Sequence, residues 1–344
     1  MRFNKVCIEA LAYHLPEKIV TSDDIEKRLS PIYDRLKLPY GRLELMSGIK
    51  ERRFFDNDTR PSEVSFLAGE KALNKSRIDK NEIGCLIHAS VCRDFLEPAT
   101  ASIVHHKLQL KPEIQVFDIS NACLGVLNGM IFVASMIELG QISAGLIVSG
   151  ENGGPLVEST INELLSRPDI TRSEIKSSFA SLTIASSAVA VLLTHEDLSS
   201  TGSRLLGGAA MAETSFNELC QGKGASSAPL MATDSETMLK EGCKLAGKTW
   251  ERTKQILNWS NDDVDRVFCH QVGTAHRKLL FETLGLSPEI DFPTLGYLGN
   301  TGSASLPTTL AIGEEQGILE AGNKAALLGI GSGLNSIMLG IQWQ

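Results

Sequence analysis

The chain has 344 residues, a formal net charge of −8, and 42% hydrophobic and 22% charged residues. This length allows two domains of about 150 residues or one large fold built from two similar halves, and the composition, with few aromatic residues and 30 glycines, favours an α/β protein. The acidic balance without a basic cluster argues against nucleic acid as a partner and gives no electrostatic reason for membrane binding.

The N-terminal region and the apolar stretches indicate where the protein resides. Residues 1–17 alternate like a strand and lack the unbroken apolar core of a signal peptide. The longest apolar stretch, residues 125–139, is interrupted by Asn128 and Glu138 and is too short to span a bilayer. The seven cysteines are scattered without paired metal-binding spacing. We therefore expect a cytoplasmic protein with reduced thiols, no metal site and no membrane span.

The first half of the chain alternates strands with helices. Its expected elements, in chain order, are a strand at 3–12, a helix capped by residues 21–24, a helix at 61–73, a strand at 85–91, a short helix near 103–108, a strand ending at 119, a long helix to 139 and a strand at 144–148. This alternation predicts sheets that are covered by helices on both faces.

The second half repeats this plan at a constant shift. Asp263-Val264 lies 181 positions after Glu82-Ile83, and each pair precedes a strand; residues 325–328 resemble residues 144–147 at the same shift of 181. One shift over two elements separated by a long helix indicates an internal duplication. The predicted fold is a layered helix–sheet–helix–sheet–helix sandwich of two halves, residues 1–195 and 200–344.

Residues 150–180 have no counterpart in the repeat. They are expected to form an inserted cap or substrate-channel region, or simply a connecting loop with a helix.

Cys123 lies at a junction between a strand and a helix, in the segment FDISNACLGVLNG. A helix N-terminus has unpaired N–H groups and a partial positive charge, so it would stabilise a thiolate and hold an oxyanion. The alternative is a small buried hydrophobic residue, as most free cysteines are. Under the duplication Cys123 corresponds to Ala304, and the two junctions are expected to face each other.

Four motifs together resemble the thiolase superfamily, in the branch of β-ketoacyl-ACP synthase III. They are Cys123 in NACLG, His270 in CHQVG, Asn300 in GNTGSASLP, and GIGSGLN at residues 329–335. The resemblance covers nearly the whole chain and implies the thiolase fold, a five-layered αβαβα sandwich of two duplicated halves. It also implies an acyltransferase, with coenzyme A thioesters as substrates and no further cofactor.

Within this branch the chain resembles the OleA group, which joins two fatty acyl-CoA molecules by a non-decarboxylative Claisen condensation to a β-keto acid. Residues 31–36 and 93–102 are similar to segments of that group, and His276 follows His270 as it does there. The resemblance implies a homodimer in which Glu97 reaches into the partner's active site and removes an α-proton. Without it, a carboxylate in a loop would be read as a solvated surface group.

The resemblance also assigns the other roles. Cys123 would accept the first acyl group, while His270 and Asn300 would donate hydrogen bonds to the second thioester carbonyl as its enolate forms. The alternatives are a core histidine and a turn asparagine. The backbone N–H groups of Cys123 and Ser332 would form the first oxyanion hole.

Gly331 and Gly333 flank Ser332 and would let the backbone approach the substrate closely. The alternative is a tight turn after a buried strand, and the two interpretations are compatible.

Two departures from β-ketoacyl-ACP synthase III bear on the second substrate. Met46 stands where that family commonly has an arginine that holds coenzyme A, and where the family has HQAN followed by a carrier-docking arginine this chain has Gly273 and then Ala275. Docking of acyl carrier protein is therefore possible but not favoured. The alternatives to an OleA-like reaction are a decarboxylative condensation with malonyl-ACP and a non-catalytic, synthase-like scaffold subunit.

Overall fold

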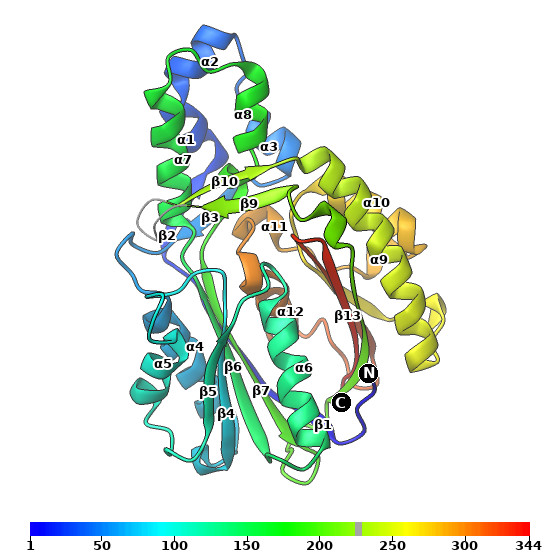
Figure 1. Ribbon diagram of the computed structural model, residues 1–344. Coiled ribbons are helices and arrows are strands. Elements are labelled where there is room, and N and C mark those ends of the chain that lie inside the picture. The colour runs from blue at the N-terminus through cyan, green and yellow to red at the C-terminus, as the bar shows by residue number, and fades with distance from the viewer. Residues whose placement is uncertain (224–228) are drawn as a thin grey trace.

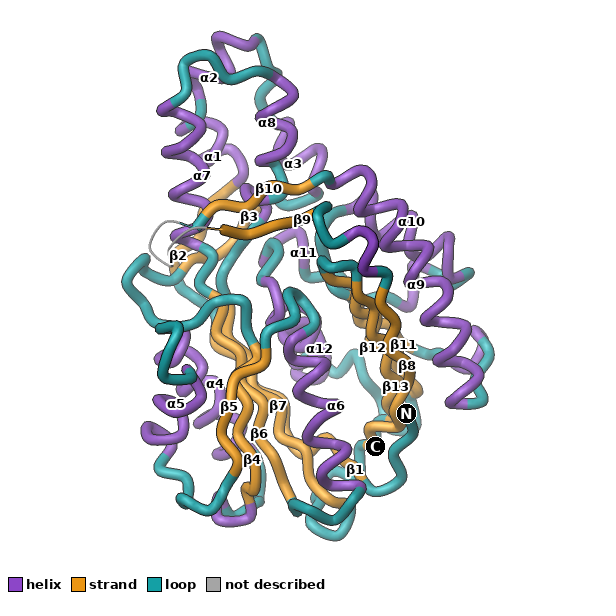
Figure 2. The backbone as a smooth tube through the Cα atoms, viewed as in Figure 1, coloured by secondary structure: helices purple, strands orange, loops and turns teal. Residues whose placement is uncertain are grey.

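The computed structural model describes residues 1–223 and 229–344. Its central feature is a mixed sheet of nine strands in the order β11-β12-β13-β8-β1-β7-β6-β4-β5 within these residues. Strands β1 and β8 meet in the middle of the sheet, where Cys7 pairs with Arg204. Helices lie on both faces and between the two halves of the sheet, as Figures 1 and 2 show.

The strands of the large sheet are β1 (Val6–His14), β4 (Ile83–Ala89), β5 (Gln115–Ile119), β6 (Ala144–Glu151), β7 (Ser187–His195), β8 (Arg204–Ala212), β11 (Arg266–Cys269), β12 (Lys324–Gly331) and β13 (Asn335–Gln342). Two small antiparallel pairs are β2 (Lys18–Thr21) with β3 (Glu51–Phe54), and β9 (Cys220–Lys223) with β10 (Leu230–Thr233).

The two halves of the large sheet have the same strand plan. In the first half β4 and β6 are parallel neighbours, followed by antiparallel β7 and then β1. In the second half β11 and β12 are parallel neighbours, followed by antiparallel β13 and then β8. β5 extends the first half, whereas the second half has only an isolated parallel bridge between Val267 and Asp291 in that place. This matched order is the structural form of the internal repeat.

The helices, in chain order, are α1 (Ser22–Arg28), α2 (Ser30–Leu36), α3 (Arg42–Ser47), α4 (Pro61–Lys75), α5 (Thr100–Leu108), α6 (Gly125–Glu138), α7 (Gly154–Ser166), α8 (Arg172–Ser178), α9 (Ser235–Leu257), α10 (Thr274–Leu284), α11 (Leu295–Leu298) and α12 (Ser305–Glu315). α4 and α5 cover the outer face of the first half, α9 and α10 cover the outer face of the second half, and α6 and α12 lie between the halves (Figure 1). The order of layers is therefore αβαβα, which confirms the predicted thiolase-type sandwich.

The middle layer contains the two duplicated junctions, which do face each other. The N–H of Val126, in the first turn of α6, donates a hydrogen bond of 3.0 Å to Oγ of Ser303, just before α12. Leu127 and Met130 of α6 share one buried apolar cluster with Leu306 and Leu310 of α12. Burial of these side chains between the two halves of the sheet is the main driving force for joining the halves.

Residues 150–180 form the end of β6, α7 and α8, and they pack with the N-terminal helices α1 and α2 in a separate apolar cluster. Together these four helices make a cap at one end of the molecule (Figure 1). Arg28 of α1 binds Glu158 of α7 through two contacts of 2.7 and 2.6 Å. The sequence interpretation had not assigned α1 and α2 to this cap, because the contacts that create it join residues more than a hundred positions apart.

Among the described residues, no helix is both long enough and apolar enough to cross a lipid bilayer.

Candidate active site

The turn that carries Cys123 is strained and half-buried. β5 ends at Ile119, and α6 begins at Gly125 with Leu124 as its N-cap, so Cys123 lies just before the helix. Ala122 has φ = +46°, a left-handed conformation that side chains other than Gly seldom adopt. Such strain costs about 1–3 kcal/mol and is retained where a side chain must be held in a defined direction. The turn presents Cys123 between the two halves of the large sheet.

A second turn, between β12 and β13, lies against the Cys123 backbone. A Cβ atom added to Gly331 would lie 3.0 Å from Cγ of Leu124 and 3.7 Å from the backbone nitrogen of Cys123. Gly333 has φ = +124°, which also requires glycine. Within the described residues, no hydrogen bond joins the N–H groups of Cys123 and Ser332 to an acceptor in another residue. This is the arrangement that the predicted oxyanion hole needs.

Asparagine side chains fasten the two turns to each other. Nδ2 of Asn335 lies 3.3 Å from Oδ1 of Asn121 and 3.3 Å from the carbonyl oxygen of Ser332. Nδ2 of Asn121 donates to Oδ1 of Asn128 on α6 at 2.8 Å. This chain of amides fixes the Ser332 turn relative to the Cys123 turn.

Burial raises the pKa of the Cys123 thiol to about 12, and the negative charge of Glu151 and the thiol of Cys220 add to this effect. This shift opposes the predicted helix-stabilised thiolate in the resting protein, because burial disfavours the charged form of the thiol. Cys123 is a thiol at neutral pH and must lose its proton when it attacks a thioester.

His270 follows the last residue of β11 and is 3% exposed. Its N–H donates to the carbonyl oxygen of Leu328 on β12 at 3.0 Å, so the strand that ends in the Gly331 turn also positions His270. Burial, together with the nearby His276, lowers the pKa of His270 to about 3. The imidazole is therefore neutral at physiological pH and suits a hydrogen-bonding role more than a cationic one.

Asn300 lies in a buried turn, residues 299–303, which we call the Asn300 turn. Its N–H donates to the carbonyl oxygen of Thr183 at 3.0 Å, and its carbonyl oxygen accepts from the N–H of Ala185 at 2.8 Å. Oδ1 of its side chain accepts from the N–H of Gly302 at 3.1 Å. This bond shows that the other end of the side-chain amide is the NH2 group. Within the described residues that NH2 group donates no hydrogen bond.

Glu151 is a buried carboxylate beside this site that the sequence interpretation missed. It is the last residue of β6 and is 4% exposed. Its oxygens accept hydrogen bonds from the N–H groups of Val91 (2.9 Å), Cys92 (3.1 Å) and Ser303 (3.1 Å). Burial raises its pKa, and these backbone donors oppose the shift. A charged residue that ends the otherwise uncharged strand AGLIVSGE was the signal that could have drawn attention to it.

Glu97 lies apart from these residues in the subunit. It belongs to the segment 90–99 between β4 and α5, which we call the Glu97 loop, and its side chain is exposed. Within the described residues its carboxylate accepts no hydrogen bond. The structure thus places Cys123, Ser332, Gly331 and Gly333 together. It connects the Asn300 turn to them through the hydrogen bond between Ser303 and Val126, and His270 lies at the end of the adjoining strand.

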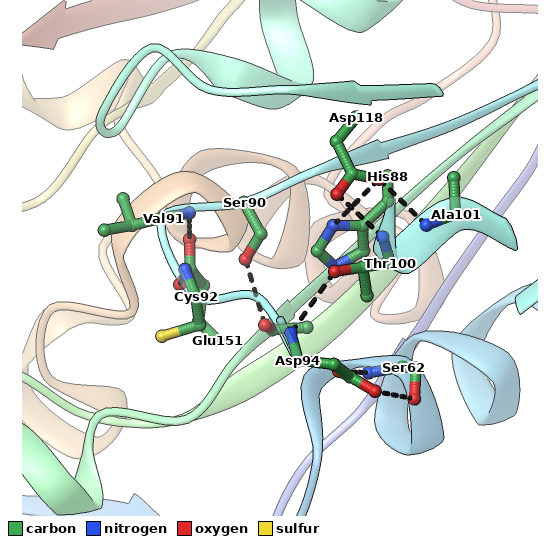
Figure 3. Close-up of polar contacts among 11 residues, drawn as sticks. Ser62, His88, Ser90, Val91, Cys92, Asp94, Thr100, Ala101, Asp118 and Glu151 are labelled. Carbon is green, nitrogen blue, oxygen red and sulfur yellow. Dashed lines mark hydrogen bonds and ion pairs between the residues drawn. The ribbon is translucent and has the colours of Figure 1, made fainter. Parts of the chain in front are cut away.

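Buried polar groups hold both ends of the Glu97 loop (Figure 3). Oγ of Ser90 donates to the carbonyl oxygen of Gly150, and Asp94 accepts from the N–H and Oγ of Ser62 at 2.9 and 2.6 Å. At the far end Asp118 accepts from the N–H groups of Thr100 and Ala101, both at 2.8 Å. The loop is exposed at its tip but fixed where it leaves the fold.

His88 lies beneath this loop, with Nδ1 at 3.9 Å from Asp118. Burial lowers its pKa to about 4, although the charges of Asp118 and Asp94 act in the opposite direction. Burial likewise lowers the pKa of His276 to about 4. Together with His270, three histidines are thus held neutral in the folded protein.

These histidines predict loss of stability in mild acid. An unfolded histidine has a pKa of about 6.5, so below that pH the unfolded chain binds protons that the folded chain does not. The free energy of unfolding should therefore fall from pH 6.5 towards pH 4. Urea denaturation across this range should show the fall, and His88→Gln should reduce its slope. The exposed His106, changed to Gln, is the control and should leave the slope unchanged; an equal effect of both variants would contradict the assignment to His88.

Within the described residues no group of three or more His, Cys, Asp or Glu side chains is arranged to hold a metal ion.

Comparison with known proteins agrees with the fold. Residues 255–343 match the family model described as 3-oxoacyl-[acyl-carrier-protein (ACP)] synthase III C terminal. The chain is 42% identical to the acyl-CoA:acyl-CoA alkyltransferase of Shewanella oneidensis, over all of both chains, and 26% identical to a β-ketoacyl-[acyl-carrier-protein] synthase III of Natranaerobius thermophilus, over 98% of each. A crystal structure of Xanthomonas campestris OleA with bound lauric acid and lauroyl-CoA superposes with a TM-score of 0.94 at 38% identity, covering 99% of this chain and 100% of that one.

A thiolase fold with these motifs at its duplicated junctions defines a condensing acyltransferase of the β-ketoacyl synthase III type. Within that class, the full-length identity of 42% to the Shewanella alkyltransferase assigns the chain to one branch. The chain belongs to the acyl-CoA:acyl-CoA alkyltransferase family.

Proposed function

We propose that this protein condenses two fatty acyl-CoA thioesters head to head without decarboxylation, to give a β-keto acid. Full-length similarity to the Shewanella alkyltransferase carries this proposal. The structural feature that favours it over a decarboxylative synthase is the fixed loop that presents Glu97. A reaction that starts with loss of carbon dioxide needs no base, whereas removal of an α-proton does.

The first half-reaction uses Cys123. Its sulfur attacks the first acyl-CoA, coenzyme A leaves as the thiol, and the acyl group remains as a thioester on Cys123. The N–H groups of Cys123 and Ser332 stabilise the oxyanion that forms during the attack. Because both turns are tied together by Asn121 and Asn335, these donors are positioned before the substrate arrives.

The second half-reaction joins the chains. Neutral His270 and the NH2 group of Asn300 donate hydrogen bonds to the thioester carbonyl of the second acyl-CoA, which stabilises its enolate while Glu97 of the other subunit takes the α-proton. The α-carbon attacks the acyl group on Cys123, and the Cys123 sulfur leaves. Water then hydrolyses the β-ketoacyl-CoA to the β-keto acid and coenzyme A.

A homodimer is part of this proposal because Glu97 is exposed and, within the described residues, makes no hydrogen bond to the site of its own subunit. The Glu97 loop exposes Val91, Phe95 and Leu96, the last with 89% of its surface accessible. Phe132 of α6 is 54% exposed beside Phe117 of β5, whose strand forms the edge of the sheet. An apolar patch next to a free strand edge is typical of a protein interface, and pairing there would carry Glu97 towards the partner.

The same proposal includes a cytoplasmic location, acyl-CoA as the substrate and no organic cofactor or metal. Docking of acyl carrier protein is not favoured, since Met46 and Ala275 replace cations that serve coenzyme A and carrier binding in β-ketoacyl-ACP synthase III.

The direct test gives the purified protein lauroyl-CoA alone. Free coenzyme A should appear, measured as released thiol, together with the β-keto acid or its decarboxylated ketone, measured by mass spectrometry. Product only after addition of malonyl-ACP would replace this proposal by the decarboxylative one. Absence of an acyl adduct on Cys123 would instead favour the non-catalytic scaffold.

A further inference from the structure

Glu151 contacts two regions that the reaction needs and is itself assigned to neither oxyanion hole. On one side it accepts hydrogen bonds from the N–H groups of Val91 and Cys92, where the Glu97 loop leaves β4. On the other side it accepts the N–H of Ser303 in the Asn300 turn. Figure 3 shows the first of these contacts within the polar network of the loop.

The contact with the Asn300 turn extends to the nucleophile. A Cβ atom on Gly302 would lie 3.1 Å from Oε1 of Glu151, and the N–H of Gly302 holds the Asn300 side chain. Oγ of Ser303 accepts from the N–H of Val126 in the first turn of α6, which follows Cys123. Glu151 is thus a common support for the Asn300 turn and for the start of α6.

We propose that Glu151 is a positioning residue for both active sites of the dimer. Through the Asn300 turn it supports the site of its own subunit, and through Val91 and Cys92 it sets the position of Glu97 in the partner's site. This inference rests on the proposed function, in which Glu97 acts across the dimer.

A carboxylate is needed at this position because three N–H groups point at it from different segments. Oε1 accepts hydrogen bonds from the N–H groups of Val91 and Ser303, while Oε2 accepts one from the N–H of Cys92. A carboxylate accepts at both oxygens, whereas glutamine has one accepting and one donating end. Glu151→Gln therefore sets its NH2 group against the N–H of Cys92 and shifts the start of the Glu97 loop.

Hybrid dimers separate the two roles. One chain carries Glu97→Gln and keeps Cys123, and the other carries Cys123→Ala and keeps Glu97, so each dimer has one complete site. The chains carry different affinity tags, and the hybrid is isolated by two successive purifications. Glu151→Gln is then introduced on one chain or the other. The matched control is Glu70→Gln, at an exposed position of α4.

On the Cys123→Ala chain, Glu151→Gln should leave lauroyl transfer to the partner's Cys123 unchanged but lower β-keto acid formation by about 10- to 100-fold, because Glu97 is displaced. An unchanged condensation rate would overturn the role in the partner's site. Glu151→Asp, which keeps two accepting oxygens, should restore part of the rate.

When Glu151→Gln is on the chain that keeps Cys123, a second measurement tests the role of Glu151 in the site of its own subunit. The charged or titratable groups that affect this thiol are Glu151 and Cys220. Removing the Glu151 charge should move the pH profile of Cys123 alkylation by iodoacetamide to lower pH, while condensation falls. A profile that does not move would overturn the role beside the nucleophile.

Failure of the proposed function is recognised separately. Wild-type protein that makes no β-keto acid contradicts the condensation itself, and an active wild type with an inactive parent hybrid contradicts only the delivery of Glu97 across the dimer. In the latter case the role of Glu151 in the partner's site is also refuted, and the alkylation profile still decides its role beside Cys123. Circular dichroism and gel filtration establish that each variant is folded and dimeric.

Discussion

Replacing Cys123 by Ala is expected to abolish acyl transfer, with release of coenzyme A from lauroyl-CoA reduced by about 10³-fold or more. The loss is this large because the thioester on Cys123 is the intermediate through which every later step passes. Thiol release and intact-protein mass spectrometry after incubation with lauroyl-CoA measure both the rate and the adduct.

Cys243→Ala is the matched control for the Cys123 variant. Cys243 lies in the core between α9 and the second half of the sheet, so its loss should lower stability by about 1 kcal/mol but leave the acyl adduct in place. Normal coenzyme A release by Cys123→Ala, or an adduct at another residue, would show that Cys123 is not the acceptor.

Replacing Glu97 by Gln is expected to separate the two half-reactions. The Cys123 thioester should still form at the wild-type rate, while β-keto acid formation falls by about 10²- to 10⁴-fold, as expected for loss of a general base. Single-turnover measurements with lauroyl-CoA would follow the adduct and the product in the same sample.

Mixing the two defective proteins tests where Glu97 acts. Homodimers of Glu97→Gln and of Cys123→Ala should each be inactive in condensation, and hybrid dimers should regain up to half the wild-type activity. An unaffected condensation rate in Glu97→Gln would instead point to decarboxylative chemistry, and inactive hybrids would place Glu97 in its own subunit.

The sequence was sufficient for the fold because the repeat is visible in it. A constant shift between residues 82–147 and 263–328 corresponds to the matched strands β4 with β11 and β6 with β12. Sequence patterns were also reliable where the interaction joins neighbouring residues. Thr21 caps α1, and its side chain accepts a hydrogen bond from the N–H of Asp24, as predicted. The resemblance located Cys123, His270 and Asn300, whose roles remain predictions until variants are measured.

The sequence was not sufficient where long-range packing decides the outcome. The cap needs α1 and α2 to meet α7 and α8, and no local pattern records that contact. The charge state of Cys123 depends on burial between the two halves of the large sheet and on Glu151, which is distant in sequence. In both cases the deciding neighbours are brought together only by the tertiary fold.

The two ends of the large sheet differ in how far their strand edges are covered. At one end, within the described residues, β5 leaves a whole strand edge unpaired. At the other end β11 is partly covered by the segment at Asp291, through its bridge to Val267 and the 3.3 Å hydrogen bond from the N–H of Phe292 to the Val267 carbonyl oxygen. In the proposed homodimer, pairing through β5 would use the more open of these two edges in each copy and leave the partly covered β11 edges outermost, which disfavours continued growth into a polymer.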